Sequence, residues 1–217
     1  EPETNKYGGK SCAVKYDGQA FYIQTPRCRL PYCLGKYEEK DSGGNTVKTK
    51  YSLDFSLAGY DLKEDGSPIN QKMRDFYECM VKMQNLLVET AHTNCDSWLD
   101  MPDATEGVAK ALTRDILRFS KDKVTKKVTT KWPPTVKARV GHWDGRFTLN
   151  AFNDKKERVE DLDAEIIPRT EAIGILKLTG VTFAGGKVGY SFSVHQVKLY
   201  APQGMPSYAF IEDEDDE

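Results

Sequence analysis

Apolar side chains repeat with a period of two towards both ends of the chain and with a period of ~3.6 between them. Within Lys48–Leu57 the apolar side chains Tyr51, Leu53, Phe55 and Leu57 alternate with polar ones, which predicts a half-buried strand. Ser67-Pro68 supplies an N-cap and a first-turn proline, and apolar residues then recur at three- and four-residue steps. This pattern predicts an amphipathic helix that runs to about Ala91 and packs on the strands. A second, shorter helix is expected at about Thr105–Leu117.

The remaining strands are predicted to pair in hairpins, because turn residues rich in glycine separate them. Arg29–Tyr37 is expected to form a further strand despite Pro31, and Asp41–Thr46 a loop. In the last strand the apolar phase shifts near His195-Gln196, which predicts a β-bulge. The three expected hairpins are Ser11–Tyr16 with Gln19–Thr25, Pro134–His142 with Arg146–Asn153, and Glu171–Phe183 with Val188–Tyr200.

Strands, one helical excursion and strands again favour a mainly β fold with a helical insertion (α+β), built as an OB-fold-like barrel. We expect residues 1–210 to form a single domain, with the insertion at about 67–117 and an acidic C-terminal tail at 211–217. No apolar run approaches the roughly 18 residues of a membrane span, and the first residues lack a signal-peptide pattern. An intracellular protein without a membrane contact is therefore expected.

The charge of the chain is unevenly distributed. The net charge is −2, but the last six residues contribute −6, so residues 1–211 carry +4. A basic body with a concentrated acidic terminus indicates either a partner-binding tail or a tail that only improves solubility. The six acids of the tail are Glu212, Asp213, Glu214, Asp215, Asp216 and Glu217.

The sequence offers little support for catalysis. It has five cysteines without a C-x-x-C pair, three scattered histidines and no glycine-rich nucleotide-binding motif. Two acidic clusters, Asp61/Glu64/Asp65 and Asp161/Asp163/Glu165, could in principle hold a metal, but they lie in polar connecting segments and are expected to be surface loops. We therefore predict no cofactor, no metal and no catalytic residue, and keep a metal-dependent nuclease as an alternative.

Cations and aromatic side chains are concentrated in the predicted strands of the last third. Because a strand alternates, Lys137 and Arg139 share one face, opposite the apolar face of Val136 and Ala138. A row of cations can neutralise a phosphate backbone, and aromatic rings can stack on bases of any identity. The other predicted nucleic-acid contacts are Lys50, Arg146, Lys177 and Lys187, with Trp132, Trp143 and Phe183 as stacking aromatics.

The order of these parts resembles a known family. The Tyr51–Leu57 strand, the long helix, the Thr135–Arg139 strand, Asn153–Glu157 and the Lys177–Lys187 hairpin precede an acidic terminus. This order is similar to that of the single-stranded DNA-binding proteins of podovirus-type phages. It also resembles related proteins of large algal and other eukaryotic DNA viruses, which share the run at residues 183–187.

The resemblance implies an OB fold, a cationic groove, and an acidic tail that competes with DNA and recruits replication enzymes. Lys137 and Arg139 would match the groove cations of the family, and Phe183 its stacking aromatic. The chain departs from the family by an extra N-terminal hairpin and by a shorter tail that ends in glutamate. The departure at the tail bears on how replication partners would dock.

From these observations we expect a non-enzymatic protein that coats single-stranded DNA with little sequence preference during replication, recombination and repair. Its expected partners are single-stranded DNA and, through the acidic tail, DNA polymerase and helicase/primase; a homodimer is also considered. The expected location is at replication sites, in the host nucleus or cytoplasm if the protein is viral. A structural or virion protein is the second alternative to this assignment.

Overall fold

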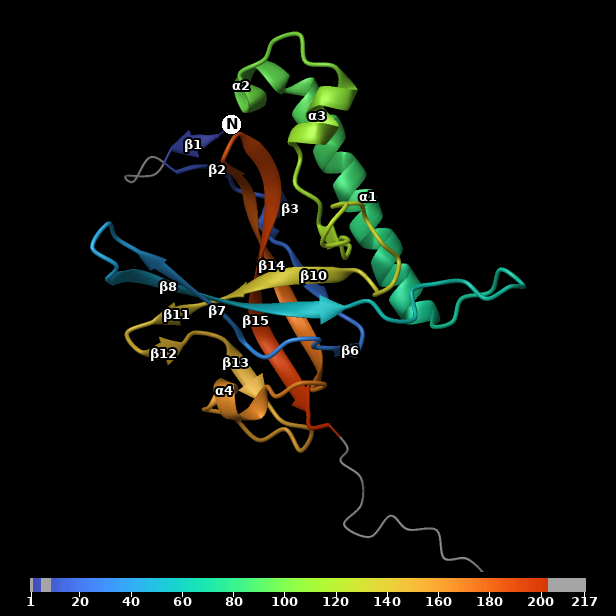
Figure 1. The fold of residues 1–217 in the computed structure, drawn as a ribbon, viewed down its shortest axis with the longest axis vertical. Helices are drawn as coiled ribbons and strands as arrows, with labels where there is room; N and C mark the ends of the chain where they lie inside the picture. Colours follow the sequence, from blue (N-terminus) through green and yellow to red (C-terminus); the bar gives the residue numbers. More distant parts are fainter. Residues whose placement is uncertain (1, 5–8, 203–217) are drawn as a thin grey trace, which may run out of the picture.

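The computed structural model describes residues 2–4 and 9–202, so the predicted acidic tail lies outside the described residues. The fold is mainly β with a helical insertion, as expected (Figure 1). The strands are β1 (Glu3–Thr4), β2 (Lys10–Cys12), β3 (Lys15–Tyr16), β4 (Gln19–Ala20), β5 (Tyr22–Gln24), β6 (Cys28–Arg29), β7 (Gly35–Lys40), β8 (Thr46–Ser56), β9 (Leu117–Arg118), β10 (Thr135–Val140), β11 (His142–Trp143), β12 (Arg146–Phe147), β13 (Asn150–Phe152), β14 (Glu171–Ala184) and β15 (Lys187–Tyr200). The helices are α1 (Gln71–Thr93), α2 (Cys95–Leu99), α3 (Glu106–Leu112) and α4 (Leu162–Glu165).

Five strands pair in a closed ring. β14 pairs with β6 through Glu171 and Arg29, and β6 pairs with β8 through Arg29 and Ser56. β8 runs antiparallel to β10, which pairs in parallel with β15 at Arg139 and Ser193. β15 then pairs with β14 along nearly its whole length and completes the ring. In chain order the ring strands are β6, β8, β10, β14 and β15, an arrangement of the OB type.

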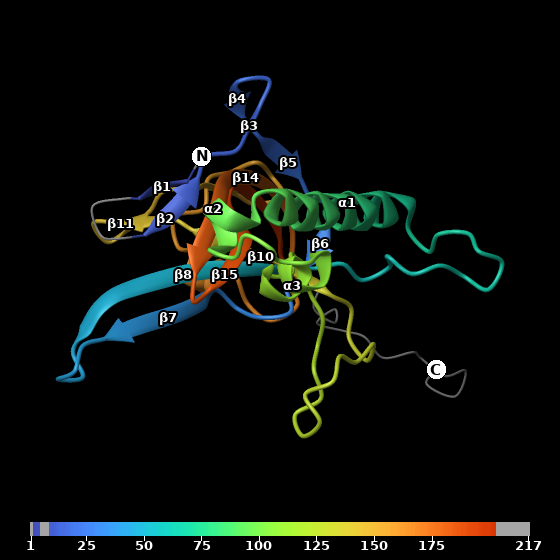
Figure 2. The ribbon, with the colours of Figure 1, turned by 90° about the horizontal axis from the view of Figure 1, so that it is seen from above.

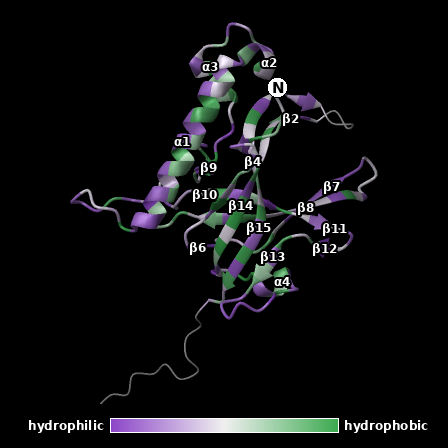
Figure 3. Ribbon diagram, turned by 180° about the vertical axis from the view of Figure 1, so that it is seen from behind, coloured by the Kyte–Doolittle hydropathy of each residue, from purple (hydrophilic) through white to green (hydrophobic). Residues whose placement is uncertain are grey.

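The interior of the ring is apolar. Leu53 and Phe55 of β8 are fully buried, as are Val136 and Ala138 of β10, so the predicted core faces of both strands are confirmed. On β8 the opposite face is also partly covered, since Ser52 and Ser56 are buried. The exposed side chains Lys137 and Arg139 lie on the opposite face of β10, also as predicted. In Figure 3 the hydrophobic segments gather where the long strands cross, whereas the surrounding loops are mostly hydrophilic. No helix of the described residues is long and apolar enough to cross a membrane.

Helix α1 covers one side of this core, but it begins later than predicted. Met73, Phe76 and Met80 belong to the same buried cluster as the barrel strands. The N-cap is Asn70, whose side chain accepts a hydrogen bond of 3.2 Å from the backbone N–H of Met73. The prediction of Ser67 as the cap is wrong, because its hydroxyl donates instead to Asp65 in the preceding turn, at 2.6 Å.

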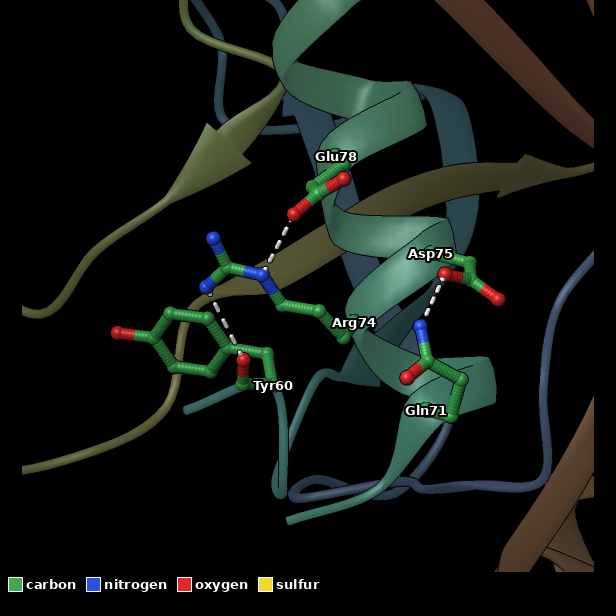
Figure 4. Close-up of polar contacts among 5 residues, drawn as sticks. All are labelled: Tyr60, Gln71, Arg74, Asp75 and Glu78. Atoms are coloured by element: carbon green, nitrogen blue, oxygen red, sulfur yellow. Dashed lines mark hydrogen bonds and ion pairs between the residues drawn. The ribbon is translucent and has the colours of Figure 1, made fainter. Parts of the chain in front are cut away.

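Polar contacts fix the first turns of α1 to the preceding loop (Figure 4). The Arg74 guanidinium donates to Glu78 on the same helix at 2.8 Å and to the backbone carbonyl of Tyr60 at 3.4 Å. Gln71 donates to Asp75 at 2.7 Å, one turn further along. The Arg74–Tyr60 contact joins the loop to the helix, and the other two contacts stabilise the first turns of α1 itself.

One predicted strand and one predicted helix need correction. The prediction of a single strand at Arg29–Tyr37 is wrong, because β6 ends at Arg29 and β7 begins at Gly35. Pro31 cannot donate to a strand ladder, and the N–H of Leu30 donates to the Thr170 carbonyl at 2.8 Å. The second helix is also shorter than predicted and ends at Leu112, because Thr113 forms a bridge with Val188 of β15.

The three predicted hairpins differ in extent. Only β3 and β4 pair around Asp17-Gly18, since β2 and β5 each pair with β14 instead. Likewise β11 pairs with β12 in a short separate hairpin, while β10 stays in the barrel. The β14–β15 hairpin is confirmed over its full length, and the register steps from Ile175–Gln196 to Leu176–Val194. His195 is thus the extra residue of the bulge that the sequence predicts.

Candidate nucleic-acid interface

A cationic pocket of about 160 Å³ lies between β10, the β14–β15 hairpin and the segment that enters β9. Four basic side chains line it together with hydroxyl groups and aromatic rings. Its lining residues are Arg114, Asp115, Ile116, Arg118, Lys137, Arg139, Thr182, Tyr190, Ser191 and Phe192. The pocket therefore gathers the two predicted cations of β10 with two arginines from the end of the helical insertion.

Arg114 is the most firmly held of the four cations. Its Nη2 atom donates to the carbonyl and to the hydroxyl oxygen of Thr182, at 2.8 Å in each case. Its backbone N–H donates to the Val188 carbonyl at 2.7 Å. Gly189 leaves the space that the arginine side chain fills, since a Cβ there would lie 2.7 Å from Nε of Arg114. Burial, followed by the nearby charges of Arg139 and Arg118, lowers the pKa of Arg114.

The neighbouring strands position the other cations of this pocket. Pairing of β9 with β10 places Arg118 opposite Thr135, one strand away from Lys137. On the other side of β10, Asp54 of β8 is the cross-strand partner of Lys137. Burial raises the pKa of the Asp54 carboxyl, and the charges of Lys137 and Arg118 oppose this rise. Asp54 thus places a carboxylate beside the cations that would bind phosphate.

Two adjoining pockets extend this surface into a track. The next pocket shares Arg114 and Arg118 with the first and adds Lys121, Phe119 and Lys187. A third pocket shares Lys187 and continues around the loop between β14 and β15. Its further lining residues are Lys10, Trp98, Leu99, Asp100, Phe183, Ala184, Gly185, Gly186 and Val188. We call these three adjoining pockets the groove; basic and aromatic side chains recur along all of it.

Phe183 lies in the groove, but it is packed more closely than a free stacking platform. It is half-buried, with its ring 5.5 Å from that of Trp98 in an edge-to-face arrangement. The ammonium group of Lys10 lies 5.2 Å from the ring centroid and donates at 2.6 Å to the Ser97 carbonyl. One side of Phe183 therefore belongs to a small apolar cluster, and the other lines the third pocket.

Lys177 faces the same side of the barrel as Arg139. Both residues are register partners of Ser193, from β14 and β10 respectively. Two strand spacings separate them, or about 10 Å. Beyond Lys177 lies Tyr22 of β5, whose ring centroid is 5.9 Å from the lysine ammonium group and 5.1 Å from the His195 ring. Lys177 and Tyr22 therefore continue the cationic and aromatic surface beyond Arg139.

Five predicted contacts do not line the groove, and one of them is Lys177, which lies beyond it on β14. Lys50 lies on the β7–β8 hairpin, which projects away from the barrel (Figure 2), and pairs with Glu39 at 2.7 Å. Trp143 and Arg146 lie together on the short β11–β12 hairpin, where Trp143 is 80 % exposed. Trp132 is exposed on the connection to β10. The six acids of the tail lie outside the described residues, so the structure gives them no position.

Arg114, Arg118 and Lys10 line the groove but are absent from the sequence-based prediction. The predicted helix over 105–117 placed Arg114 inside a helix, which concealed its contact with β14. The acidic clusters considered as metal ligands have local structural roles. Asp65 accepts hydrogen bonds from Ser67 in a turn, and Asp161 caps α4 by accepting from the Ala164 N–H at 3.1 Å.

The groove occupies the outer face of the third ring strand, β10, together with the hairpin that the fourth and fifth ring strands form. OB barrels bind oligonucleotides on the face of their second and third strands and on neighbouring loops, and the groove shares with that surface the third strand and the loop between the fourth and fifth. Its cations suit phosphates and its aromatic rings suit bases. Fold and site together define a basic, aromatic groove on the surface of an OB-type barrel.

Solved structures with a similar arrangement come from bacteriophages. The single-stranded DNA-binding protein of bacteriophage Enc34 in complex with ssDNA is 12 % identical, with a TM-score of 0.49 over 94 % of this chain and 96 % of that chain. The gp2.5 single-stranded DNA-binding protein of bacteriophage T7 is 13 % identical, with a TM-score of 0.41 over 88 % and 98 %. No protein-family model and no curated protein matches the chain. The functional assignment therefore rests on the groove itself.

Proposed function

We propose that this chain is a non-enzymatic single-stranded DNA-binding protein. The observation that carries the proposal is the convergence of Arg114, Arg118, Lys137 and Arg139 in one pocket on the outer face of an OB-type barrel. Four cations at this density favour an anionic ligand, and a phosphate backbone supplies one negative charge per nucleotide. The two adjoining pockets add further cations along the same path.

A single strand fits the groove better than a duplex. Phe119, Phe183 and Tyr190 line successive parts of the track, and the bases of a single strand can reach such rings because they are not paired. Stacking accepts every base, so binding would show little sequence preference. The protein would coat single-stranded DNA exposed during replication, recombination and repair.

The acidic tail extends this proposal to partners. Six consecutive acids, Glu212–Glu217, form a concentrated negative segment suited to basic surfaces on a DNA polymerase or a helicase/primase. Recruitment of these enzymes to the coated strand, in the host nucleus or cytoplasm, is the part of the proposal that the tail supports. A homodimer on DNA would be compatible with the same function.

A salt titration with a short fluorescent DNA oligonucleotide tests the proposal. Each phosphate contact on a single strand contributes about −0.7 to the slope of log K against log salt, so the four cations of the first pocket predict a slope of about −3. The Lys137→Ala/Arg139→Ala variant should reduce this slope to about −1.4, because two contacts remain. Arg158→Ala is the matched control, since Arg158 is an exposed cation paired with Glu160 outside the groove.

Three outcomes would reject the proposal. One is wild-type slope and affinity in the Lys137→Ala/Arg139→Ala variant, which would place the binding surface elsewhere. Another is cleavage of the oligonucleotide on addition of magnesium, which would favour a metal-dependent nuclease. Absence of binding at low salt would leave a structural or virion role as the better assignment.

A further inference from the structure

A second basic pocket of about 590 Å³ lies at the opposite end of the long β14–β15 pair from the hairpin loop. In Figure 1 the hairpin loop lies near α2, and the other end of the pair lies at the bottom of the barrel. We call this second pocket the basin. Its lining residues are Arg27, Arg29, Arg169, Glu171, Ala201 and Pro202.

Three guanidinium groups and one carboxylate give the basin a net charge of +2. Arg27 donates to Glu171 at 2.7 Å and lies over the Tyr200 ring, 3.9 Å from its centroid. Arg29 and Tyr200 are the register partners of Glu171 on its two sides. Within residues 2–4 and 9–202, Arg29 and Arg169 form no ion pair. Two exposed guanidinium groups are therefore available to a ligand.

Arg169 has an unusual backbone conformation for an arginine. It follows Pro168 in a turn closed by a hydrogen bond of 3.1 Å from the Thr170 N–H to the Ile167 carbonyl, and its φ is 75°. Glycine or asparagine suits this position of a turn, because a larger side chain strains the left-handed conformation. The turn places the exposed Arg169 side chain in the lining of the basin.

We propose that the basin binds the acidic C-terminal segment of this same chain, Glu212–Glu217. Ala201 and Pro202 line the basin, and Glu212 follows Pro202 by ten positions. A random-coil link of ten residues would have a root-mean-square span of about 16–19 Å, which is enough for the six carboxylates to reach the basin. Guanidinium groups bind carboxylates through paired, charge-assisted hydrogen bonds.

The groove is the other cationic surface that the tail could reach, and the resemblance described above implies that the tail competes with DNA there. On β14, Lys177 follows Glu171 by six positions, which corresponds to a distance of about 20 Å along the strand. Thr182 lies about 35 Å from Glu171 along the same strand. The basin adjoins the start of the segment, so the effective concentration of the tail is highest at the basin. This inference concerns the tail alone and does not rest on DNA binding.

Photo-cross-linking in the full-length chain tests the proposal. Ile211→p-benzoyl-phenylalanine places the photoreactive group beside the acidic run and leaves all six acids in place. After irradiation at low salt and low protein concentration, mass spectrometry should find residue 211 joined to peptides that contain residues 27–29, 169–171 or 201–202. The product should migrate as a monomer.

Charge variants identify the surface that holds the tail. Arg29→Gln/Arg169→Asn should reduce the basin cross-link about fivefold, because two exposed ion pairs are lost. Asparagine tolerates the left-handed backbone at residue 169, and thermal melting confirms that the variant folds. Lys137→Ala/Arg139→Ala is the matched control and should leave the cross-link unchanged. Cross-links to the groove, a dimeric product, or no product would each overturn the proposal.

Discussion

Gly189 sets the position of Arg114, so an alanine at residue 189 tests whether the Arg114 guanidinium binds phosphate. A Cβ at this position would lie 2.7 Å from Nε and 3.0 Å from Cβ of Arg114. Separations this short force the arginine side chain to move away from its two hydrogen bonds with Thr182. Gly189→Ala is therefore expected to displace the Arg114 guanidinium from the groove without altering any charge.

The expected loss of affinity corresponds to one phosphate contact. Such a contact contributes about 0.7 to the salt slope, so at about 0.1 M salt it accounts for roughly a fivefold difference in affinity, or ~1 kcal/mol. Gly189→Ala and Arg114→Gln should each weaken single-stranded DNA binding by about this factor. Because both variants act through one guanidinium group, the double variant should bind no more weakly than Arg114→Gln alone.

Fluorescence anisotropy of a labelled oligonucleotide, measured between about 0.05 and 0.3 M salt, gives both the affinity and the slope. Gly107→Ala is the matched control, since a Cβ there would make only an ordinary contact of 3.8 Å with Thr105. Thermal melting checks that each variant is folded during the titration. Additive losses in the double variant, or wild-type binding by Gly189→Ala, would refute the role given to Arg114.

Phe183→Leu should keep the apolar contact with Trp98 but lose stacking on the bases. It should therefore weaken binding to DNA homopolymers of every base by about 1–3 kcal/mol, with little change in melting temperature. A loss of affinity confined to one base would contradict this role. Burial raises the pKa of Asp54, so the folded chain favours the neutral form of this carboxyl group. The free energy of unfolding therefore decreases as the pH rises through the pKa of Asp54 and the buried group becomes charged. Asp54→Asn should therefore be more stable than the wild type and bind DNA more tightly at neutral pH. The DNA affinity of the wild type should increase as the pH falls, whereas that of Asp54→Asn should not. Identical pH profiles for the two proteins would contradict this account. In Gly174→Ala a Cβ would lie 2.8 Å from the Phe55 ring in the core, so urea denaturation should show a loss of about 1–3 kcal/mol, and an unchanged midpoint would argue against this packing.

The long strands were predictable because a period of two reports directly which face of a strand is buried. In the last strand, the shift of phase at His195 also predicted the bulge that the register shows. On β10 the same reasoning placed Lys137 and Arg139 on the exposed face. Each of these predictions depends on neighbouring residues of one strand, so the sequence alone carries the required information.

The rest of the groove depends on contacts between distant segments. Arg114 reaches the groove because Thr113 bridges to Val188 and the segment leaves its helix, a tertiary interaction that overrides local helix propensity. Lys10 reaches Phe183 because β2 pairs with β14, whereas the sequence suggested a hairpin with its neighbour. Local pattern also cannot separate Trp143 at a remote turn from an aromatic in the groove, since both follow a strand.

The parallel contact between β10 and β15 closes the ring through a single register pair, Arg139 with Ser193. Arg139 also lines the cationic pocket, so the seam of the barrel and its ligand surface share a residue. A ligand that binds only the closed ring must therefore stabilise the seam, by RT ln(1 + [L]/Kd). Amide hydrogen exchange along this seam would then report occupancy of the groove, with slower exchange when the groove is filled.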